Sequence, residues 1–211
     1  MIVENKIKVW DTFIRTFHWS LVVLFFTAYL TGDEESMLHI YAGYGVLGLL
    51  IFRIIWGFIG TKHARFSNFV FGPQTTRQYI SSILSRKPVR YIGHNPLGGW
   101  MVILLLVTLG AVTWSGLELY ASEGHGPLAS KDIIMIQTAQ ADEDNNEHKG
   151  KRADKPESRE HKLWEEVHEI ISNFGLMLVF LHIAGVIFGS ILHHENLIRA
   201  MITGYKDKPS D

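Results

Sequence analysis

The sequence predicts an all-α integral membrane protein, a single domain over residues 1–211 in which four transmembrane helices form a bundle. Charge is strongly segregated along the chain, although the formal net charge is only −1. A helix needs about 20 apolar residues to cross a hydrocarbon core about 30 Å thick. Three segments of that length carry almost no charge: Ile40–Gly60 with only Arg53, Leu97–Leu117 with none, and Ile170–Leu192 with only the titratable His182.

A fourth segment, Phe13–Leu30, is long enough to cross if Arg15 and His18 lie near one membrane surface or have partners. It ends in bulky residues rather than the small residues of a signal-peptide cleavage site, so we expect a retained helix. The four helices are predicted at about 12–31, 38–60, 97–118 and 165–193.

The loops differ in charge, and this difference predicts the orientation. The connection 61–96 has six basic and no acidic residues, whereas the turn after the first helix has three acidic and no basic ones. Because lysine and arginine collect in cytoplasmic loops, we expect 61–96 and both termini in the cytoplasm and 119–164 outside, in a bacterial inner (plasma) membrane. Within the outer loop, 138–161 is highly charged, lacks aromatic residues and is predicted to be disordered.

Gln74–Lys87, within the cytoplasmic loop, has two interpretations. Tyr79, Ile80, Ile83 and Leu84 recur at helical spacing among basic residues, which fits a short helix in the headgroup plane. A solvated basic loop that only sets the topology accounts for the sequence equally well.

The cysteine and histidine contents limit the possible cofactors. The absence of cysteine excludes disulfides, iron–sulfur clusters and the C-x-x-C-H attachment of c-type haem. Of the 11 histidines, those inside spanning segments are functional candidates, because ionisable side chains are costly in a bilayer. Four meet that condition: His18, His39, His168 and His182.

The two histidines of the last helix indicate two separate sites. His168 and His182 are 14 residues apart, which is about 21 Å and just under four turns, so they share nearly the same helix face. Two histidines that bind one zinc ion from a helix would be three or four residues apart. The longer spacing suits two sites stacked across the membrane.

The predicted topology supplies a partner for each of these histidines. His18 and His182 fall at the cytoplasmic level, and His39 and His168 fall at the outer level. Two imidazoles from facing helices can take both axial positions of a haem iron, and the lack of an open position favours electron transfer over oxygen binding. We therefore expect two haems of b type, with these pairs as axial ligands.

Two arginines are further candidates for cofactor binding. Arg53 follows His39 by 14 residues and so lies near the level of His18 and His182. Arg53 and Arg15 could each bind the propionates of the inner haem or a quinone headgroup, although snorkelling to the membrane surface accounts better for Arg15.

The four membrane histidines have two alternative interpretations. They could be hydrogen-bonded contacts between helices, but such contacts do not predict two histidines at each depth. They could also mark a proton or metal path in a transporter. Transporters usually interrupt their helices near the midplane, whereas Val22–Phe26 and Leu104–Leu109 are continuous and apolar.

Several motifs together resemble the prokaryotic cytochrome b561 family, which includes the b-type subunits of nickel–iron hydrogenases. The resemblance covers nearly the whole chain except Ser130–Lys162. The matching motifs are Arg15–Trp19 with Thr31–Gly32, His39–Gly43, Phe52–Gly60, His94–Trp100, the pattern from His168 through His182 to Gly185, His194–Leu197 and Met201–Gly204.

This resemblance implies an electron-transfer subunit of a quinone-linked oxidoreductase in the respiratory chain. The haem ligands of that family correspond to His18, His39, His168 and His182 of this sequence. The expected partners are the lipid bilayer, a quinone or quinol, and an extracytoplasmic hydrogenase or c-type cytochrome; no nucleic acid is expected. Oxidation of superoxide with delivery of electrons to quinone is an alternative function. A non-redox transporter or membrane anchor is the alternative of a different class.

Overall fold

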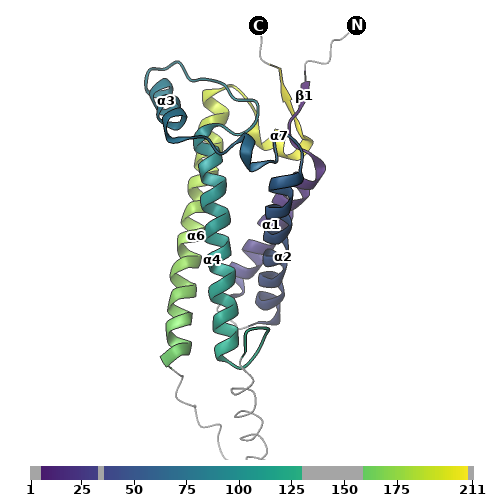
Figure 1. The fold of residues 1–211 in the computed structure, drawn as a ribbon, viewed down its shortest axis with the longest axis vertical. Helices are drawn as coiled ribbons and strands as arrows, with labels where there is room; N and C mark the ends of the chain where they lie inside the picture. The colour runs from purple at the N-terminus through teal and green to yellow at the C-terminus, as the bar shows by residue number, and fades with distance from the viewer. Residues whose placement is uncertain (1–5, 33–35, 130–158, 209–211) are drawn as a thin grey trace, which may run out of the picture.

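Four long helices stand side by side and a small cap of loop, helix and strand covers one end of them (Figure 1). The computed structural model describes residues 6–32, 36–129 and 159–208. Along the chain the elements are β1 (Lys6–Lys8), α1 (Thr12–Leu30), α2 (Met37–Ile59), η2 (Phe66–Asn68), α3 (Pro73–Leu84), α4 (Pro96–Ser122), α6 (Arg159–Leu192), α7 (Leu197–Thr203) and β2 (Tyr205–Asp207).

The first three long helices begin at residues whose side chains cap the free backbone amides. Asp11 accepts from the amide of Ile14 at 2.9 Å before α1, and Asn95 accepts from Gly98 at 2.7 Å before α4. Ser36 does the same for His39 before α2. Capping satisfies amides that have no partner within the helix, which matters where a helix enters a membrane.

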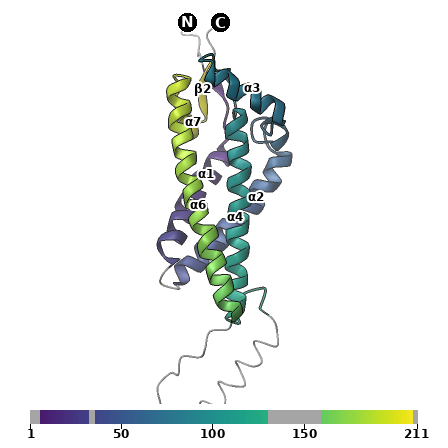
Figure 2. The same ribbon diagram turned by 90° about the vertical axis from the view of Figure 1, so that its left-hand side faces the viewer.

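The bundle consists of two helix pairs. α1 packs on α2, α4 packs on α6, and α2 joins the pairs by contacting α4. α4 and α6 lie side by side in both ribbon views (Figures 1 and 2). The shared core contains Phe25, Val46, Leu50 and Leu109. The outward faces are also apolar, and α1, α2, α4 and α6 are each long and apolar enough to cross a membrane.

The cap lies at what we call the basic end, the end that holds residues 61–95 and both strands. There β1 and β2 pair antiparallel, with Ile7 opposite Lys206. Beneath the strands, Trp10 and Ile14 pack with Ala64 and Ala200 in a buried cluster. The opposite end, where α1 ends, α2 begins and α4 ends, we call the acidic end. The first and last described elements of the chain, β1 and β2, therefore both lie at the basic end (Figure 1).

The helical fold class predicted from the sequence is confirmed, with differences in detail. The segment with two interpretations forms the helix α3. The last long helix begins at Arg159, six residues before its predicted start, because polar helix-forming residues extend it beyond the apolar stretch that hydropathy detects. Of the stretch 138–161 predicted to be disordered, 138–158 falls outside the described residues, and 159–161 forms the start of α6. The β1–β2 pairing was not predicted.

Candidate functional site

Four histidines from three helices meet as two pairs inside the bundle. His18 of α1 and His182 of α6 form the basic-end pair, with ring centroids 6.5 Å apart and planes inclined by 52°. His39 of α2 and His168 of α6 form the acidic-end pair, with centroids 5.9 Å apart and planes inclined by 82°. The structure thus brings together the two combinations that the sequence grouped by depth.

The backbones around these pairs are spaced apart. Neither α1 nor α2 is among the helices that pack closely on α6, although α6 contributes a histidine to both pairs. The imidazoles therefore extend across the separation from opposite sides. Near the acidic end, Tyr29 of α1 also crosses it and donates a hydrogen bond to Asn173 Oδ1 of α6 at 2.7 Å.

Hydrogen bonds fix the orientation of both rings of the acidic-end pair. His39 Nδ1 lies 2.8 Å from the carbonyl oxygen of Ala28. Since a carbonyl only accepts, this nitrogen carries the proton and the lone pair is on Nε2. His168 Nδ1 lies 3.0 Å from Ser115 Oγ, whose own hydroxyl donates to the carbonyl of Val112 at 3.0 Å. His168 Nδ1 is therefore also a donor.

The basic-end pair has no comparable contacts. His18 Nδ1 is buried and, within the described residues, has no hydrogen-bond partner. The imidazole of His182 likewise forms no hydrogen bond to any other side chain or backbone group that the structure describes. Both rings thus leave their nitrogens free of protein partners there.

The two predicted arginines lie on the basic-end side of the bundle and differ in environment. Arg53 is only 3% exposed, and its guanidinium carbon lies 4.8 Å from the ring centroid of Phe66 and 5.7 Å from that of Phe69. Its Nη1 is buried without a partner among the described residues. Arg15 instead donates to the carbonyl of Ile202, which ties α1 to α7.

The model of the family described as prokaryotic cytochrome b561 matches residues 9–204 of this sequence. This chain belongs to the prokaryotic cytochrome b561 family. It is accordingly a multi-pass membrane protein of a b-type cytochrome family. The family resemblance predicted from the motifs is confirmed.

Three relatives carry the same name, "Probable Ni/Fe-hydrogenase B-type cytochrome subunit". The one from Rhizobium leguminosarum bv. viciae is 28% identical over 153 residues, 59% of this chain and 64% of the relative. The one from Azotobacter vinelandii is 31% identical over 154 residues, 58% of this chain and 62% of the relative. This cytochrome thus spans less than two thirds of the length of these two relatives.

The Rhodobacter capsulatus relative of that name is 22% identical over 244 aligned positions, which cover 99% of this cytochrome and 84% of the relative. No solved structure matches the chain at a significant level.

The two histidine pairs of this cytochrome fit the haem that its family implies. Metal–imidazole bonds of about 2.0 Å on both faces of one iron place the two ring centroids about 6 Å apart. The observed separations of 5.9 and 6.5 Å agree with that spacing. In the described part of the chain, no hydrogen bond engages Nε2 of any of the four rings, and no cluster of three or more His, Cys, Asp or Glu side chains forms a metal site of another kind.

Another buried histidine, His94, lies in the loop between α3 and α4. The ring of His94 packs between Trp10 and Phe69, with centroids 4.7 Å from each. Burial, and then the nearby charges of Arg53 and Lys206, lower the pKa of His94 to about 3, so it is neutral at physiological pH. Its Nδ1 is buried and unpaired among the described residues.

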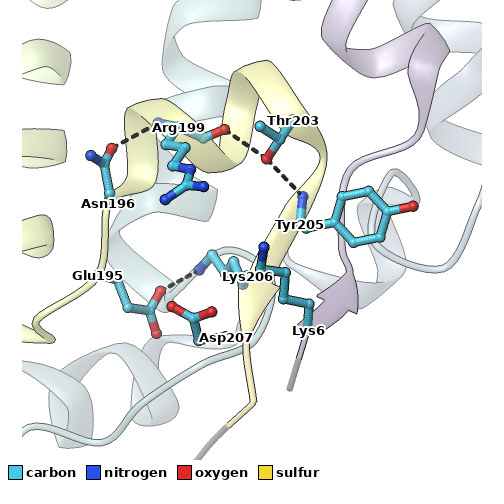
Figure 3. A pocket seen from close by; sticks show the side chains of 8 residues that line it. All are labelled: Lys6, Glu195, Asn196, Arg199, Thr203, Tyr205, Lys206 and Asp207. Atoms are coloured by element: carbon cyan, nitrogen blue, oxygen red, sulfur yellow. Dashed lines mark hydrogen bonds and ion pairs between the residues drawn. The ribbon is translucent and has the colours of Figure 1, made fainter. Parts of the chain in front are cut away.

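The cap contains a polar surface pocket that is separate from the histidine pairs (Figure 3). Glu195 forms ion pairs with Arg90 and, at 3.1 Å, with Lys206. Burial alone would raise the pKa of Glu195, but Lys206 and Arg90 outweigh it and hold the pKa below its usual value. These contacts fasten β2 to the end of α6 and to the loop before α4, which indicates a structural role.

The sequence analysis missed the residues that contact the acidic-end pair from α1 and α4. Ser115 is 1% exposed and bonds His168. A Cβ atom added to Gly116 would lie 3.0 Å from Cε1 of His168, which is tighter than ordinary van der Waals contact, so the ring would have to shift to admit a side chain there. Nothing in the local sequence distinguishes Ser115 and Gly116 from the small residues that commonly pack membrane helices.

Proposed function

We propose that this protein is a di-haem cytochrome b that carries electrons across the membrane between the quinone pool and an extracytoplasmic redox partner. The observation that carries the proposal is the presence of two histidine pairs that share α6, 14 residues and therefore about 21 Å apart along it. His18 with His182, and His39 with His168, are the proposed axial ligands of two haems of b type.

Each haem, when bound, supplies an iron that takes up and releases one electron. The two histidines of each pair would hold that iron, and a bis-histidine site of this kind would favour electron transfer over the binding of oxygen or another small ligand. Among the described residues neither α1 nor α2 packs closely on α6, which is the helix spacing that a large planar group between them would require. The apolar surroundings, such as Phe25 and Leu109 in the shared core, exclude water.

Arg53 is the proposed partner of an anionic haem propionate at the basic end. A buried guanidinium with an unpaired nitrogen needs an anion or acceptor, because an unsatisfied buried charge is costly. Arg15 is a weaker candidate for the same role, since its guanidinium already donates to Ile202 and Thr12. Its Nε is nevertheless buried without a partner in the described part of the chain.

The proposed orientation places the basic end in the cytoplasm of a bacterial inner membrane. The six basic residues of 61–96 support it through their preference for the cytoplasmic side. The acidic end then faces the extracytoplasmic partner. The names of the relatives favour a hydrogenase in that role over a c-type cytochrome. Quinone is proposed as the exchangeable electron carrier in the membrane.

The test is the haem content of the purified protein and of single-histidine variants. We expect two haems of b type per chain, and one haem per chain in His39→Ala and in His182→Ala, because each substitution removes one axial ligand of one pair. Haem is counted from the reduced pyridine complex against protein mass.

His194→Ala is the matched control, since His194 lies beyond the end of α6 and belongs to neither pair; it should retain two haems. Two haems in His39→Ala, or a folded wild-type protein without haem, would refute the proposed ligand sets. Reduction of the haem by a quinol, but not by superoxide or a reduced c-type cytochrome, would identify the quinone pool as one electron source.

A further inference from the structure

The two histidine pairs differ in what holds their second nitrogens. At the acidic end, both Nδ1 groups donate hydrogen bonds, one to the Ala28 carbonyl at 2.8 Å and one to Ser115 Oγ at 3.0 Å. At the basic end, His18 Nδ1 is buried without a partner in the described residues, and His182 has no hydrogen bond there either. The two sites therefore have the same ligand type with different surroundings.

This difference has a known chemical effect on a metal-bound imidazole. A hydrogen bond from the non-ligating N–H to an oxygen fixes the tautomer and ring orientation and raises the basicity of the ligating nitrogen. A more basic ligand stabilises the ferric state relative to the ferrous state, and so lowers the reduction potential. The acceptors at the acidic end belong to α1 and α4, which hold them rigidly.

The charge near the basic end acts in the opposite direction. Arg53 is almost fully buried, and it follows His39 by 14 residues on α2, about 21 Å along the helix and so near the level of the basic-end pair. A buried cation disfavours the additional positive charge of ferric iron, so it raises the reduction potential. The hydrogen bonds lower the reduction potential of the acidic-end site and the cation raises that of the basic-end site, so both effects widen the difference between the two potentials.

We propose, on the basis of the proposed function, that the acidic-end site has a lower reduction potential than the basic-end site. Ser115 and the Ala28 carbonyl lower the potential of the acidic-end site, and Arg53 raises that of the basic-end site. Ser115 is a positioning residue in this proposal, since it acts through His168. At equilibrium the first electron added to the protein occupies the basic-end site.

The experiment is a spectroscopic redox titration of the full-length haem-loaded protein in lipid nanodiscs. We expect two one-electron steps. Removing the acidic-end site with His39→Ala should abolish the lower-potential step, and removing the basic-end site with His182→Ala should abolish the higher one. The opposite assignment, or two steps of equal potential, would overturn the proposal while leaving the proposed ligand sets intact.

Ser115→Ala tests the hydrogen bond itself. It should raise the midpoint potential of the lower-potential step by about 59 mV, which corresponds to a tenfold change in the one-electron reduction equilibrium constant. The midpoint potential of the higher step should not change. Ser115→Thr, which keeps a hydroxyl, should restore the wild-type value. Thr113→Ala is the matched control, because the Thr113 hydroxyl bonds only carbonyls of its own helix, at 3.0 Å.

The possible outcomes remain distinguishable. If Ser115→Ala changes the midpoint potential of the higher step, or of neither step, the role of Ser115 is refuted. If Ser115→Ala loses haem, the assignment from His39→Ala and His182→Ala still decides which site has the lower potential. A wild-type protein with fewer than two haems would instead refute the proposed function.

Discussion

The acidic-end and basic-end pairs differ in which parts of the chain surround the same two side chains. At the acidic end the environment is made by the membrane helices themselves, through the Ala28 carbonyl, Ser115 and Gly116. At the basic end the two imidazoles have no hydrogen-bond partner among the described residues, and the buried cation at that level, Arg53, packs against Phe66 and Phe69 of the loop after α2. One helix can thus present equivalent ligands at two depths, while its neighbours determine how each ligand behaves.

The largest effect on the acidic-end pair is expected from a substitution at Gly116. Gly116→Val should remove one haem and leave the other, because the added side chain overlaps the space of the His168 ring but is far from the basic-end pair. Haem content per chain measures the result. Gly110→Val is the matched control on the same helix, since no atom lies within 4 Å of a Cβ atom added there. A Gly116→Val protein with two haems would show that the ring has room to move.

The cap can be loosened through Glu195. Glu195→Gln should lower the free energy of unfolding by about 2 kcal/mol, because it leaves the buried ammonium of Lys206 without its counter-charge. Thermal or denaturant unfolding in detergent measures the change. Glu166→Gln, an exposed substitution on α6, should have little effect.

The same carboxylate predicts a pH dependence. Because the pKa of Glu195 is lowered in the folded protein, its stabilising contribution is fully present above about pH 4.5, the ordinary glutamate value. The contribution is lost as the pH falls through the lower folded pKa. Glu195→Gln should therefore remove part of the acid sensitivity of the wild-type protein. Equal loss of stability in both proteins between pH 5 and pH 3 would contradict this assignment.

A substitution of Arg53 tests how far a buried cation raises the reduction potential of the basic-end site. Arg53→Met should lower the midpoint potential of the higher-potential step, by an amount that corresponds to about a tenfold change in the reduction equilibrium constant. The reason is that it removes a buried cation from the basic-end site. The two steps should move closer together in a redox titration. Arg77→Met removes an exposed cation on α3 and should leave both steps in place. Movement of the lower step alone would mean that Arg53 acts at the other site.

The sequence alone predicted the helical bundle and the depth of each histidine. Charge-free length locates the spans, and a 14-residue spacing gives two sites on one face of a helix without any knowledge of packing. The partners of His168 could not be predicted in this way, because the contact with Ser115 depends on how α4 is rotated against α6. The β1–β2 pairing was also missed, since three-residue strands about 200 positions apart leave no periodic signal.

The small β1–β2 sheet also has a consequence for assembly. One strand precedes the first membrane crossing and the other follows the last, and their backbones can pair only if both lie in the same compartment (Figure 1). An even number of crossings satisfies this requirement, whereas a chain that skipped one insertion would leave its strands separated by the bilayer. Formation of the sheet therefore excludes any inserted form in which an odd number of helices crosses the membrane.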